Sequence, residues 1–366
     1  MTNALNPKAA LMNDYFFNCD WGTSRLRLRL VNLRSGGIVA ARSSDQGAAK
    51  LAAQSTAETR GELFARVLQQ HLDEFATSAD ARSGVDARIN DAPVLISGMA
   101  SSSLGWCELP YARLPFSLEG RDLVWRRLDA SDEGSREPSA TRPIYLCSGV
   151  RSDCDVMRGE ETELLGLGIL LPDLLRRDQT LVILPGTHSK HVEISAGRIV
   201  DFHTHMTGEL YELLGSSSSL RHPLKAAAEL SGGAEGCEPI SEDDRAAFRE
   251  GVKLSRQLDL TAALFQVRVR QLLHSTPPSA SAATLSGILI GSELGSLAKQ
   301  RPGNARIVLC ASPSLCERYR AAFDSLGWFS RVEVVPPGDV ERLSALGQMV
   351  ALRHLQPNAS PQDTRA

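Results

Sequence analysis

The sequence of 366 residues lacks the features that mark several common classes of protein. Its seven cysteines include no pair with the C-x2-C spacing of a zinc or redox site. No run of about 20 apolar residues is present, so we expect no membrane-spanning helix and no membrane partner. The first residues, MTNALNPKAALMND, contain no basic region followed by an apolar core, so we expect no signal peptide. These absences, with an odd number of cysteines, favour a cytoplasmic protein.

The sequence also lacks a large excess of charge of either sign. The formal net charge is −3, and basic residues alternate with acidic ones in segments such as SEDDRAAFRE, so we expect no nucleic-acid partner. Apolar residues make up 42% of the chain, which is ordinary for a globular protein. A chain of this length divides into about two domains.

The segment FFNCDWGTSRLRLRLV, residues 16–31, predicts a hairpin with a tight corner. The alternation of Arg and Leu has period two and is typical of a half-buried strand with the leucines inward. Backbone N–H groups and hydroxyls at the corner, which contains Gly22, Thr23 and Ser24, could hold a phosphate. Asp20 could hold a cation through water. The alternative is an ordinary turn with a local hydrogen bond from the aspartate.

Strand and helix patterns alternate along the rest of the chain, which predicts an α/β protein. Strands are expected at 37–43 and 92–101, with a helix at 59–76 between them, and a polar loop is expected at 129–143. A helix is expected from 158 to 171.

A second hairpin with a Gly-Thr-hydroxyl turn is expected at 180–194, where LPGTHSKHVEI follows a buried strand. Its similarity to DWGTSRLRL is the kind that duplicated domains leave. A strand and a helix at 197–214 and further helices follow, including one at 286–299. The chain then ends in a βαβα pattern with its elements at 306–311, 314–327, 331–336 and 339–355.

Two phosphate-type turns in successive α/β halves suggest a nucleotide-binding protein of two related domains. Six motifs then resemble, in order, those of the 2-dehydro-3-deoxygalactonokinase family of the actin-like ATPase and hexokinase superfamily. They span residues 16 to about 295 and are DWGTSRLRL, ISGMASSSLGW, VMRGEETELLG, LPGTHSKHV, MTGEL and LSGILIGSE. MRGEET and LPGTH together are far more specific than either glycine turn alone.

The resemblance implies a two-domain α/β protein with the actin-like ATPase (ribonuclease H-like) fold and a ligand cleft between the domains. We expect the domains at 1–185 and 186–355, with a disordered tail at 356–366. The implied reaction is ATP-dependent phosphorylation of the 6-hydroxyl of 2-dehydro-3-deoxy-D-galactonate, a step in galactonate breakdown, with Mg²⁺ as cofactor.

The resemblance also implies site residues. Asp20 is expected to hold Mg²⁺ and to act in catalysis. Ala311 and Ser312 stand where the superfamily usually has glycine beneath the adenine, which leaves the contacts to the base open. The expected nucleotide-binding residues are Gly22, Thr23, Ser24, Arg25, Gly186, Thr187, Ala311 and Ser312.

The catalytic base is expected at the start of the helix that begins near residue 159. Related sugar kinases carry Gly-Asp-Gln there, with another glycine six residues after the aspartate, and Glu160 occupies that position relative to Gly166. The alternative is that the acidic residues only favour the positive end of the helix dipole. Glu161, Asp153 and Asp155 remain rival bases.

The sugar acid is expected to lie near SGMASSSLGW and the start of this helix. The predicted substrate-binding residues are Ser97, Gly98, Met99, Arg158 and Glu161. The chemistry of a guanidinium suggests Arg158 for the substrate carboxylate.

Four histidines cluster in the middle of the sequence, at His188, His191, His203 and His205. They lack the three-ligand spacing of a zinc site, so we expect strand or surface histidines rather than a metal site.

Two other functions remain open. One is a kinase that acts on another sugar or 2-keto-3-deoxy sugar acid, since the galactonate- and gluconate-derived epimers differ at one hydroxyl. The other is a non-catalytic sugar-sensing protein of the same fold. Whether the protein is a homodimer is also left open.

Overall fold

The computed structural model describes residues 14–77, 89, 91–128, 142–175, 179–220, 241–300 and 306–355. The predicted tail and nearly all of the predicted loop at 129–143 lie outside these ranges. The chain divides into two compact units. The first consists of Met1–Arg177, Ser195–Asp201 and Glu341–Ala366, and the second of Asp178–Ile194 and Phe202–Val340.

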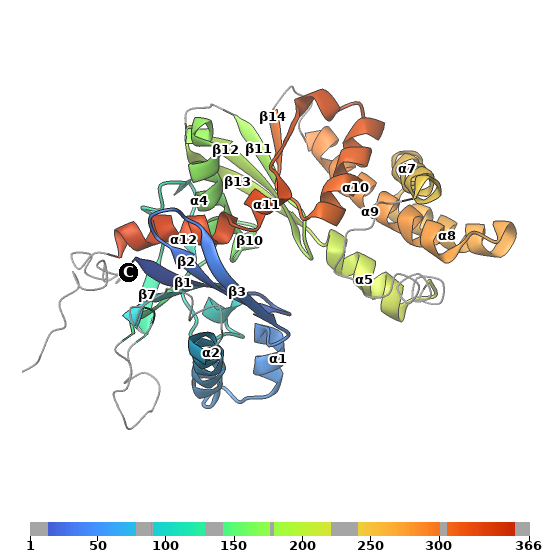
Figure 1. Ribbon diagram of the computed structural model, residues 1–366. Coiled ribbons are helices and arrows are strands. Elements are labelled where there is room, and N and C mark those ends of the chain that lie inside the picture. Colours follow the sequence, from blue (N-terminus) through green and yellow to red (C-terminus); the bar gives the residue numbers. More distant parts are fainter. Residues whose placement is uncertain are drawn as a thin grey trace, which may run out of the picture. The chain divides into compact units, whose positions relative to one another are not determined.

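The first unit is built on a six-stranded sheet with the strand order β3-β2-β1-β4-β8-β7 (Figure 1). β1, β2 and β3 are antiparallel neighbours, as the predicted hairpin requires, whereas β1, β4 and β8 run parallel and β7 is antiparallel to β8. The strands are β1 (Tyr15–Trp21), β2 (Leu26–Asn32), β3 (Ile38–Ser44), β4 (Val94–Gly98), β7 (Trp125–Leu128) and β8 (Ile144–Cys147).

Helices pack on both faces of this sheet. The leucines of β2 are buried as predicted, in a core that includes Phe64 and Leu68 of α2. On the opposite face of β1, the amide of Asn18 donates a hydrogen bond to the hydroxyl of Ser344 in α12 (3.1 Å). The helices of this unit are α1 (Ala48–Ala53), α2 (Arg60–Thr77), η3 (Met99–Ser101), α4 (Glu160–Leu170), η5 (Pro172–Leu175) and α12 (Leu343–His354).

Glycines let α4 and α12 cross at very short range. A Cβ on Gly166 would lie 2.0 Å from the carbonyl oxygen of Leu343, and one on Gly347 would lie 1.7 Å from that of Thr162. Gln348 of α12 donates to the carbonyl oxygen of Cys19 and to the hydroxyl of Ser97 in neighbouring strands. These contacts make α12 part of the first unit, so the compact units differ from the continuous domains predicted at 1–185 and 186–355.

Several strands of two residues lie between β4 and α4, and the sequence did not predict them. β5, β9 and β10 form a small sheet, and β6 pairs with Arg198 and Ile199. Strands this short carry no period-two pattern that a sequence could reveal. They are β5 (Ala112–Arg113), β6 (Phe116–Ser117), β9 (Val150–Arg151) and β10 (Val156–Met157).

The second unit contains β15, β14, β11, most of β12 and the part of β13 from Phe202 onward, in that strand order. β11 and β12 form the second predicted hairpin, and β11, β14 and β15 run parallel. The strands are β11 (Thr180–Leu184), β12 (Ser189–Ser195), β13 (Arg198–His205), β14 (Arg306–Leu309) and β15 (Val332–Val334).

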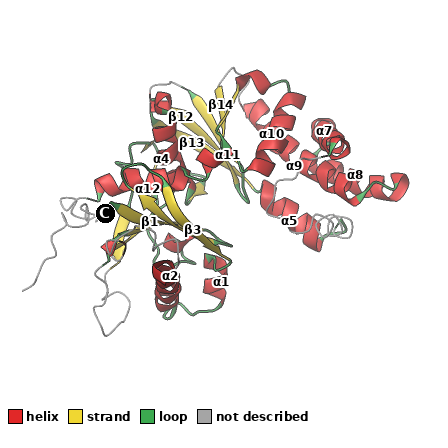
Figure 2. Cartoon of the chain, in the orientation of Figure 1, coloured by secondary structure: helices red, strands yellow, loops and turns green. Residues whose placement is uncertain are grey.

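Helices α7, α9 and α10 share a buried core with β11 and β14, and Figure 2 shows them in red beside the yellow strands. The helix predicted at 286–299 begins earlier, at Pro278, and the last predicted helix is broken between α11 and α12. The helices of this unit are α5 (Thr207–Ser217), α7 (Glu242–Gln257), α8 (Leu260–His274), α9 (Pro278–Gln300), α10 (Pro313–Ser325), η6 (Phe329–Arg331) and α11 (Pro337–Val340).

The two sheets share one strand order. In each sheet, three strands that are consecutive along the chain lie side by side. Two later strands then run parallel to the first of these three and continue the sheet beyond it, β4 and β8 next to β1 and β14 and β15 next to β11. This repeat confirms the predicted α/β class and the actin-like ATPase (ribonuclease H-like) fold. Among the described residues, no helix has the length and apolar character needed to cross a membrane, and every described cysteine is a free thiol.

Candidate functional site

The first candidate phosphate turn is the four-residue connection between β1 and β2. The N–H of Gly22 donates to the carbonyl oxygen of Arg25 (2.8 Å), which closes the turn. Thr23, Ser24 and Arg25 are exposed. The side chains of the turn therefore lie on the surface, and their binding to a phosphate stays a prediction.

The start of α1 supports this turn from behind. The N–H groups of Ala48 and Ala49 donate to the carbonyl oxygens of Gly22 and Thr23, at 3.0 Å each. Gly47 precedes them, and a Cβ there would lie 2.4 Å from the carbonyl oxygen of Thr23. Only glycine allows this close approach, so the backbone of the turn is fixed while its side chains face outward.

An aromatic cluster lies beneath the first turn. Trp21 is fully buried, and its ring centroid lies 4.7 Å from that of Phe64 and 6.5 Å from that of Trp106. The indole N–H donates to the carbonyl oxygen of Gln46 (2.9 Å). The first turn thus rests on apolar packing with one directed hydrogen bond.

Asp20 lies at the end of β1, next to this turn. β1 and β4 are parallel, and their register places Asp20 beside Ser97, so the carboxyl ends of both strands meet here. Ligands of open α/β sheets bind at this edge. The Asp20 side chain is 18% exposed and forms an ion pair with Arg27 (Oδ2 to Nη1, 3.0 Å).

The start of α4 is held against the same edge by two glycines. Gly98 ends β4 with φ of 90°, and Gly159 precedes α4 with φ of 112°, a conformation that L side chains rarely adopt. A Cβ on Gly98 would lie 2.7 Å from the carbonyl oxygen of Trp21, and one on Gly159 would lie 3.4 Å from the Cα of Gly98. The first turn of α4 therefore begins beside the ends of β1 and β4.

Glu160 and Glu161, both predicted site residues, have different surroundings. Glu160 is partly exposed, and its Oε2 accepts a hydrogen bond from the N–H of Arg158 (2.9 Å). Glu161 is fully buried; its Oε2 accepts from the N–H of Gly159 (2.6 Å) and its Oε1 has no hydrogen-bond partner. Burial, and then the charge of Glu160, raise the pKa of Glu161 to about 8. The geometry therefore favours Glu160 as the accessible carboxylate.

The rival bases lie upstream, between β9 and β10. Asp153 is exposed in this turn. Asp155 is partly buried, and its Oδ1 accepts a hydrogen bond from the N–H of Val156 (2.7 Å).

Glu163 is a residue of this site that the sequence reasoning missed. Burial, and then the charges of Asp20 and Glu160, raise its pKa to about 8, while Arg27 and Arg29 act in the opposite direction. Asp20 and Glu160 are therefore close enough to act on Glu163 electrostatically. The spacing of three residues between Glu160 and Glu163, which places both on one helix face, was the available signal.

This group of carboxylates fits a magnesium ion. Mg²⁺ prefers oxygen ligands, keeps several waters and is usually held by one or two carboxylates plus phosphates. Burial is the main cause of the raised pKa of Glu163, and the charges of Asp20 and Glu160 add to it. The chemistry of Asp20, Glu160 and Glu163 thus suits a hydrated divalent cation.

The residues predicted to bind the sugar acid make mainly internal contacts. Ser97 is buried and accepts hydrogen bonds from two neighbouring side chains. Arg158 donates to the carbonyl oxygen and the hydroxyl of Ser101, both at 2.6 Å, and its guanidinium lies 4.1 Å from the ring centroid of Tyr111. Met99 is partly exposed at the start of η3. The contact proposed between Arg158 and a substrate carboxylate gains no support from this arrangement.

The second candidate phosphate turn connects β11 and β12 and is also four residues long. Thr187 is exposed, and its carbonyl oxygen accepts a hydrogen bond from the N–H of Glu209 in α5 (3.0 Å). A Cβ on Gly208 would lie 2.4 Å from the carbonyl oxygen of Gly186. A helix start and a glycine thus support this turn as they support the first.

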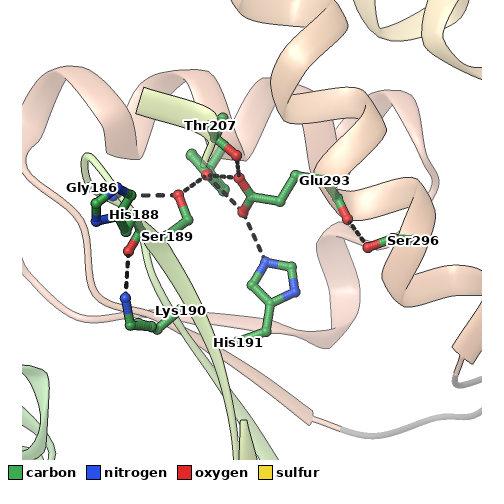
Figure 3. Close-up of polar contacts among 9 residues, drawn as sticks. Gly186, His188, Ser189, Lys190, His191, Thr207, Glu293 and Ser296 are labelled. Atoms are coloured by element: carbon green, nitrogen blue, oxygen red, sulfur yellow. Dashed lines mark hydrogen bonds and ion pairs between the residues drawn. The ribbon is translucent and has the colours of Figure 1, made fainter. Parts of the chain in front are cut away.

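Two side chains next to the turn hold it further (Figure 3). The imidazole Nε2 of His188 lies 2.5 Å from Oε2 of Glu209. Lys190 is buried, and its ammonium group donates to the carbonyl oxygen of His188 (3.2 Å). Lys190 therefore faces the protein rather than a ligand.

Of the histidines considered for metal binding, His203 has its ligand atom within 4.8 Å of those of Glu193 and Asp201, whereas others have different contacts. The imidazole of His191 is hydrogen-bonded to Glu293, in α9 (2.8 Å), and its ring centroid lies 4.5 Å from that of His205. His188 and His191 thus each pair with a carboxylate.

The predicted adenine-side residues follow β14. Ala311 is buried, and Ser312 is the exposed residue that precedes α10. The N–H of Cys310 donates to the carbonyl oxygen of Ile183 (3.0 Å), two residues before the second turn. The two segments therefore lie at the same edge of their sheet.

Comparison with known proteins gives a consistent result. A model of the family described as 2-keto-3-deoxy-galactonokinase matches residues 20–338. The chain is 32% identical over 321 residues to the 2-dehydro-3-deoxygalactonokinase of Escherichia coli (strain K12), which covers 86% of this chain and 91% of the relative. It is 33% identical over 319 residues to "Probable 2-dehydro-3-deoxygalactonokinase DgoK1" of Rhizobium meliloti (strain 1021), which covers 86% of this chain and 90% of that one.

A solved structure shows the same similarity in three dimensions. The crystal structure of "a putative 2-dehydro-3-deoxygalactonokinase protein" from Sinorhizobium meliloti superposes with a TM-score of 0.68 at 30% identity. The match covers 93% of this chain and 100% of the other.

Proposed function

The chain belongs to the 2-keto-3-deoxy-galactonokinase family, and we propose that it transfers the γ-phosphoryl group of ATP to the 6-hydroxyl of 2-dehydro-3-deoxy-D-galactonate. The product is 2-dehydro-3-deoxy-6-phospho-D-galactonate. The observation that carries the proposal is that Asp20 and the start of α4, which bears Glu160, lie at the same edge of the sheet beside the first glycine turn.

Glu160 is the proposed base. Its carboxylate is partly exposed at the start of α4. A glutamate carboxylate within hydrogen-bonding reach of a hydroxyl can act as a general base. The hydroxyl of the sugar acid is a poor acid and needs to lose its proton only as the new O–P bond forms. A carboxylate that orients the hydroxyl and takes this proton is worth roughly 10² to 10⁴ in rate.

Asp20 and Glu163 would hold Mg²⁺, which when bound neutralises charge on the phosphates. The exposed Thr23 and Ser24 of the first turn, and Thr187 of the second, would donate hydrogen bonds to phosphate oxygens. Arg25 would add positive charge. In phosphoryl transfer such positioning and neutralisation supply most of the catalysis.

A coupled assay of ADP release tests the substrate. Purified enzyme is given Mg²⁺, ATP and each of a panel of 2-keto-3-deoxy sugar acids, including the galactonate- and gluconate-derived epimers. We expect the highest kcat/KM with 2-dehydro-3-deoxy-D-galactonate, and phosphorus NMR should place the phosphate on the 6-oxygen. A higher kcat/KM with another acid would reassign the substrate.

The same assay distinguishes an enzyme from a non-catalytic sugar sensor. A sensor would bind the sugar acid without ADP release above the ATPase background. The accessible carboxylates at α4 favour turnover, because a sensor has no need of a base.

A further inference from the structure

A buried carboxylate lies beneath the second turn (Figure 3). Glu293 of α9 is 3% exposed and belongs to the LSGILIGSE motif. Its oxygens accept hydrogen bonds from the hydroxyl of Tyr319 (2.8 and 2.9 Å) and from the hydroxyl of Thr207, and His191 lies 2.8 Å from Oε1. Burial alone would raise the pKa of Glu293, but the hydrogen bonds from these three side chains outweigh it and lower the pKa. The group is therefore ionised at neutral pH.

One route from this carboxylate reaches the backbone of the turn through two hydroxyls. Burial, and then the charge of Glu293, raise the pKa of Tyr319 well above its usual value, so its hydroxyl keeps its proton and donates to the carboxylate. The hydroxyl of Ser189, 3.3 Å from that of Tyr319, must then donate to it. The oxygen of Ser189 is left to accept the N–H of Gly186 (3.4 Å). Each hydroxyl in this series therefore has a single acceptor for its proton.

A second route reaches the turn through the start of α5. Thr207 is the first residue of this helix, and its hydroxyl is bound to Oε2 of Glu293. Two residues later, the N–H of Glu209 holds the carbonyl oxygen of Thr187, and between them Gly208 is in close contact with the turn. The position of Thr207 therefore sets the position of the helix start against the turn.

One route ends on the N–H of Gly186 and the other on the carbonyl oxygen of Thr187. These two groups lie directly before and after the Gly186–Thr187 peptide, so the routes hold that peptide from both sides. A carboxylate needed only for stability would have no reason to converge on these two residues, because an apolar side chain of similar volume stabilises a core as well or better. Directed hydrogen bonds instead fix orientation, which apolar packing does not.

We propose that Glu293 is the positioning residue of the second phosphate turn: it sets the direction of the Gly186–Thr187 peptide toward the nucleotide through Tyr319 and Ser189 on one side and Thr207 on the other. The inference rests on the proposed role of this turn in binding phosphates. It deepens that role, because the selectivity for nucleotide phosphate then depends on a residue that touches no ligand.

The test is Glu293→Gln, which keeps the size of the side chain but replaces an oxygen acceptor with a donor. Binding of MgADP by calorimetry and the KM values for ATP and for the sugar acid are measured. We expect the Kd for MgADP and the KM for ATP to rise at least tenfold, with the KM for the sugar acid within about twofold of the wild-type value. Glu317→Gln on neighbouring α10, which breaks a partly exposed ion pair with Arg245 of α7, is the matched control and should change none of them.

A second pair of variants keeps the test decisive if Glu293→Gln fails to fold. Thr207→Val removes one hydroxyl from the partly exposed start of α5, and Thr207→Ser restores it. We expect the valine variant to weaken MgADP binding several-fold and the serine variant to bind normally.

Three results would overturn the inference. The folded variants could bind MgADP as tightly as the wild type. The variants could lose kcat alone, in proportion to the fraction of protein that fails to fold, or the KM values for ATP and for the sugar acid could rise equally. A wild-type enzyme that binds MgADP but phosphorylates no sugar acid in the panel would instead refute the proposed substrate. The calorimetric arm would still decide the role of Glu293.

Discussion

The two hairpin turns have the same length and the same backbone support, but the side chains that lie beneath them differ in chemistry. In both, the helix that follows the third strand donates an N–H to the carbonyl oxygen of the threonine, Thr23 or Thr187, and a glycine of that segment contacts the turn. The first turn rests on the rings of Trp21 and Phe64, whereas the second rests on the buried Glu293 and its partners.

The turns also differ in the residue two positions before the glycine. At the first turn this is Asp20, partly exposed, and at the second it is Leu184, which is buried. The proposed cation ligand, Asp20, and the proposed base, Glu160, therefore both belong to the first unit. The same kind of turn can thus serve two purposes. The residues around it decide whether it takes part in chemistry or only holds a ligand.

The largest effect should come from removing the base of the first unit. Glu160→Gln should lower kcat by roughly 10² to 10⁴ with little change in the Kd for MgADP, because the side chain keeps its size but no longer accepts a proton. Glu62→Gln is the control, since Glu62 also lies in the first turn of a helix and has the same relation to its dipole. Steady-state kinetics measure both, and similar losses in the two variants would favour the helix-dipole explanation. Near-normal activity of Glu160→Gln together with an inactive Asp155→Asn would move the base upstream.

The next effect concerns the cation. Asp20→Asn should lower kcat by about a hundredfold and raise the Mg²⁺ concentration needed for half-maximal rate, because it removes charge from the ion site. A magnesium titration of the folded variant measures this. If the titration midpoint matches that of the wild type, Asp20 does not contact the ion. Leu184→Ile, at the corresponding position of the second turn, should leave the midpoint unchanged.

The dependence of stability on pH should separate the buried acids of the two units. The pKa of Glu161 is raised to about 8, so its protonated form stabilises the fold at low pH and this stabilisation is lost as pH rises from about 5 through 8. The pKa of Glu293 is lowered, so its contribution is present above about pH 4.3 and is lost as pH falls through the lower value.

Urea unfolding across pH 3 to 9 checks this difference. Glu161→Gln should reduce the loss of stability on the alkaline side, and Glu293→Gln should reduce it on the acidic side, each by on the order of 1–3 kcal/mol. Parallel curves for the two variants would contradict the opposite pKa shifts.

The smallest effect should come from changing the glycine that supports each turn, a feature that the two turns share. Gly47→Ala and Gly208→Ala should each raise the KM for ATP about fivefold to tenfold, because the added Cβ, only 2.3–2.4 Å from turn backbone, forces the peptide to shift. Gly295→Ala is the control, since a Cβ there meets open space. A response at only one of the two turns would show that the other does not contact the nucleotide.

Sequence patterns predicted the elements that carry a clear period and the turns that carry glycine. Both hairpins, their turns and the parallel strands were found because alternation and glycine are local signals. The short strands β5, β9 and β10 were missed because two residues carry no period. Glu163 and Glu293 were missed because their importance arises from neighbours distant in sequence, Asp20 in one case and His191 and Tyr319 in the other. The close crossing of α4 and α12 depends on glycines far apart along the chain.

The place of α12 has a consequence for the order in which the protein is made. This helix fills part of the core of the first unit, through Ser344 and Gln348, yet it is synthesised after every residue of the second unit. The second unit ends at Val340, so all of its residues are available before the first unit can be completed. We expect nascent chains released at residue 340 to contain a second unit that resists limited proteolysis and a first unit that is digested. Equal resistance of both units would show that the first unit folds without α12, and its folding would then not have to wait for the second unit to be completed.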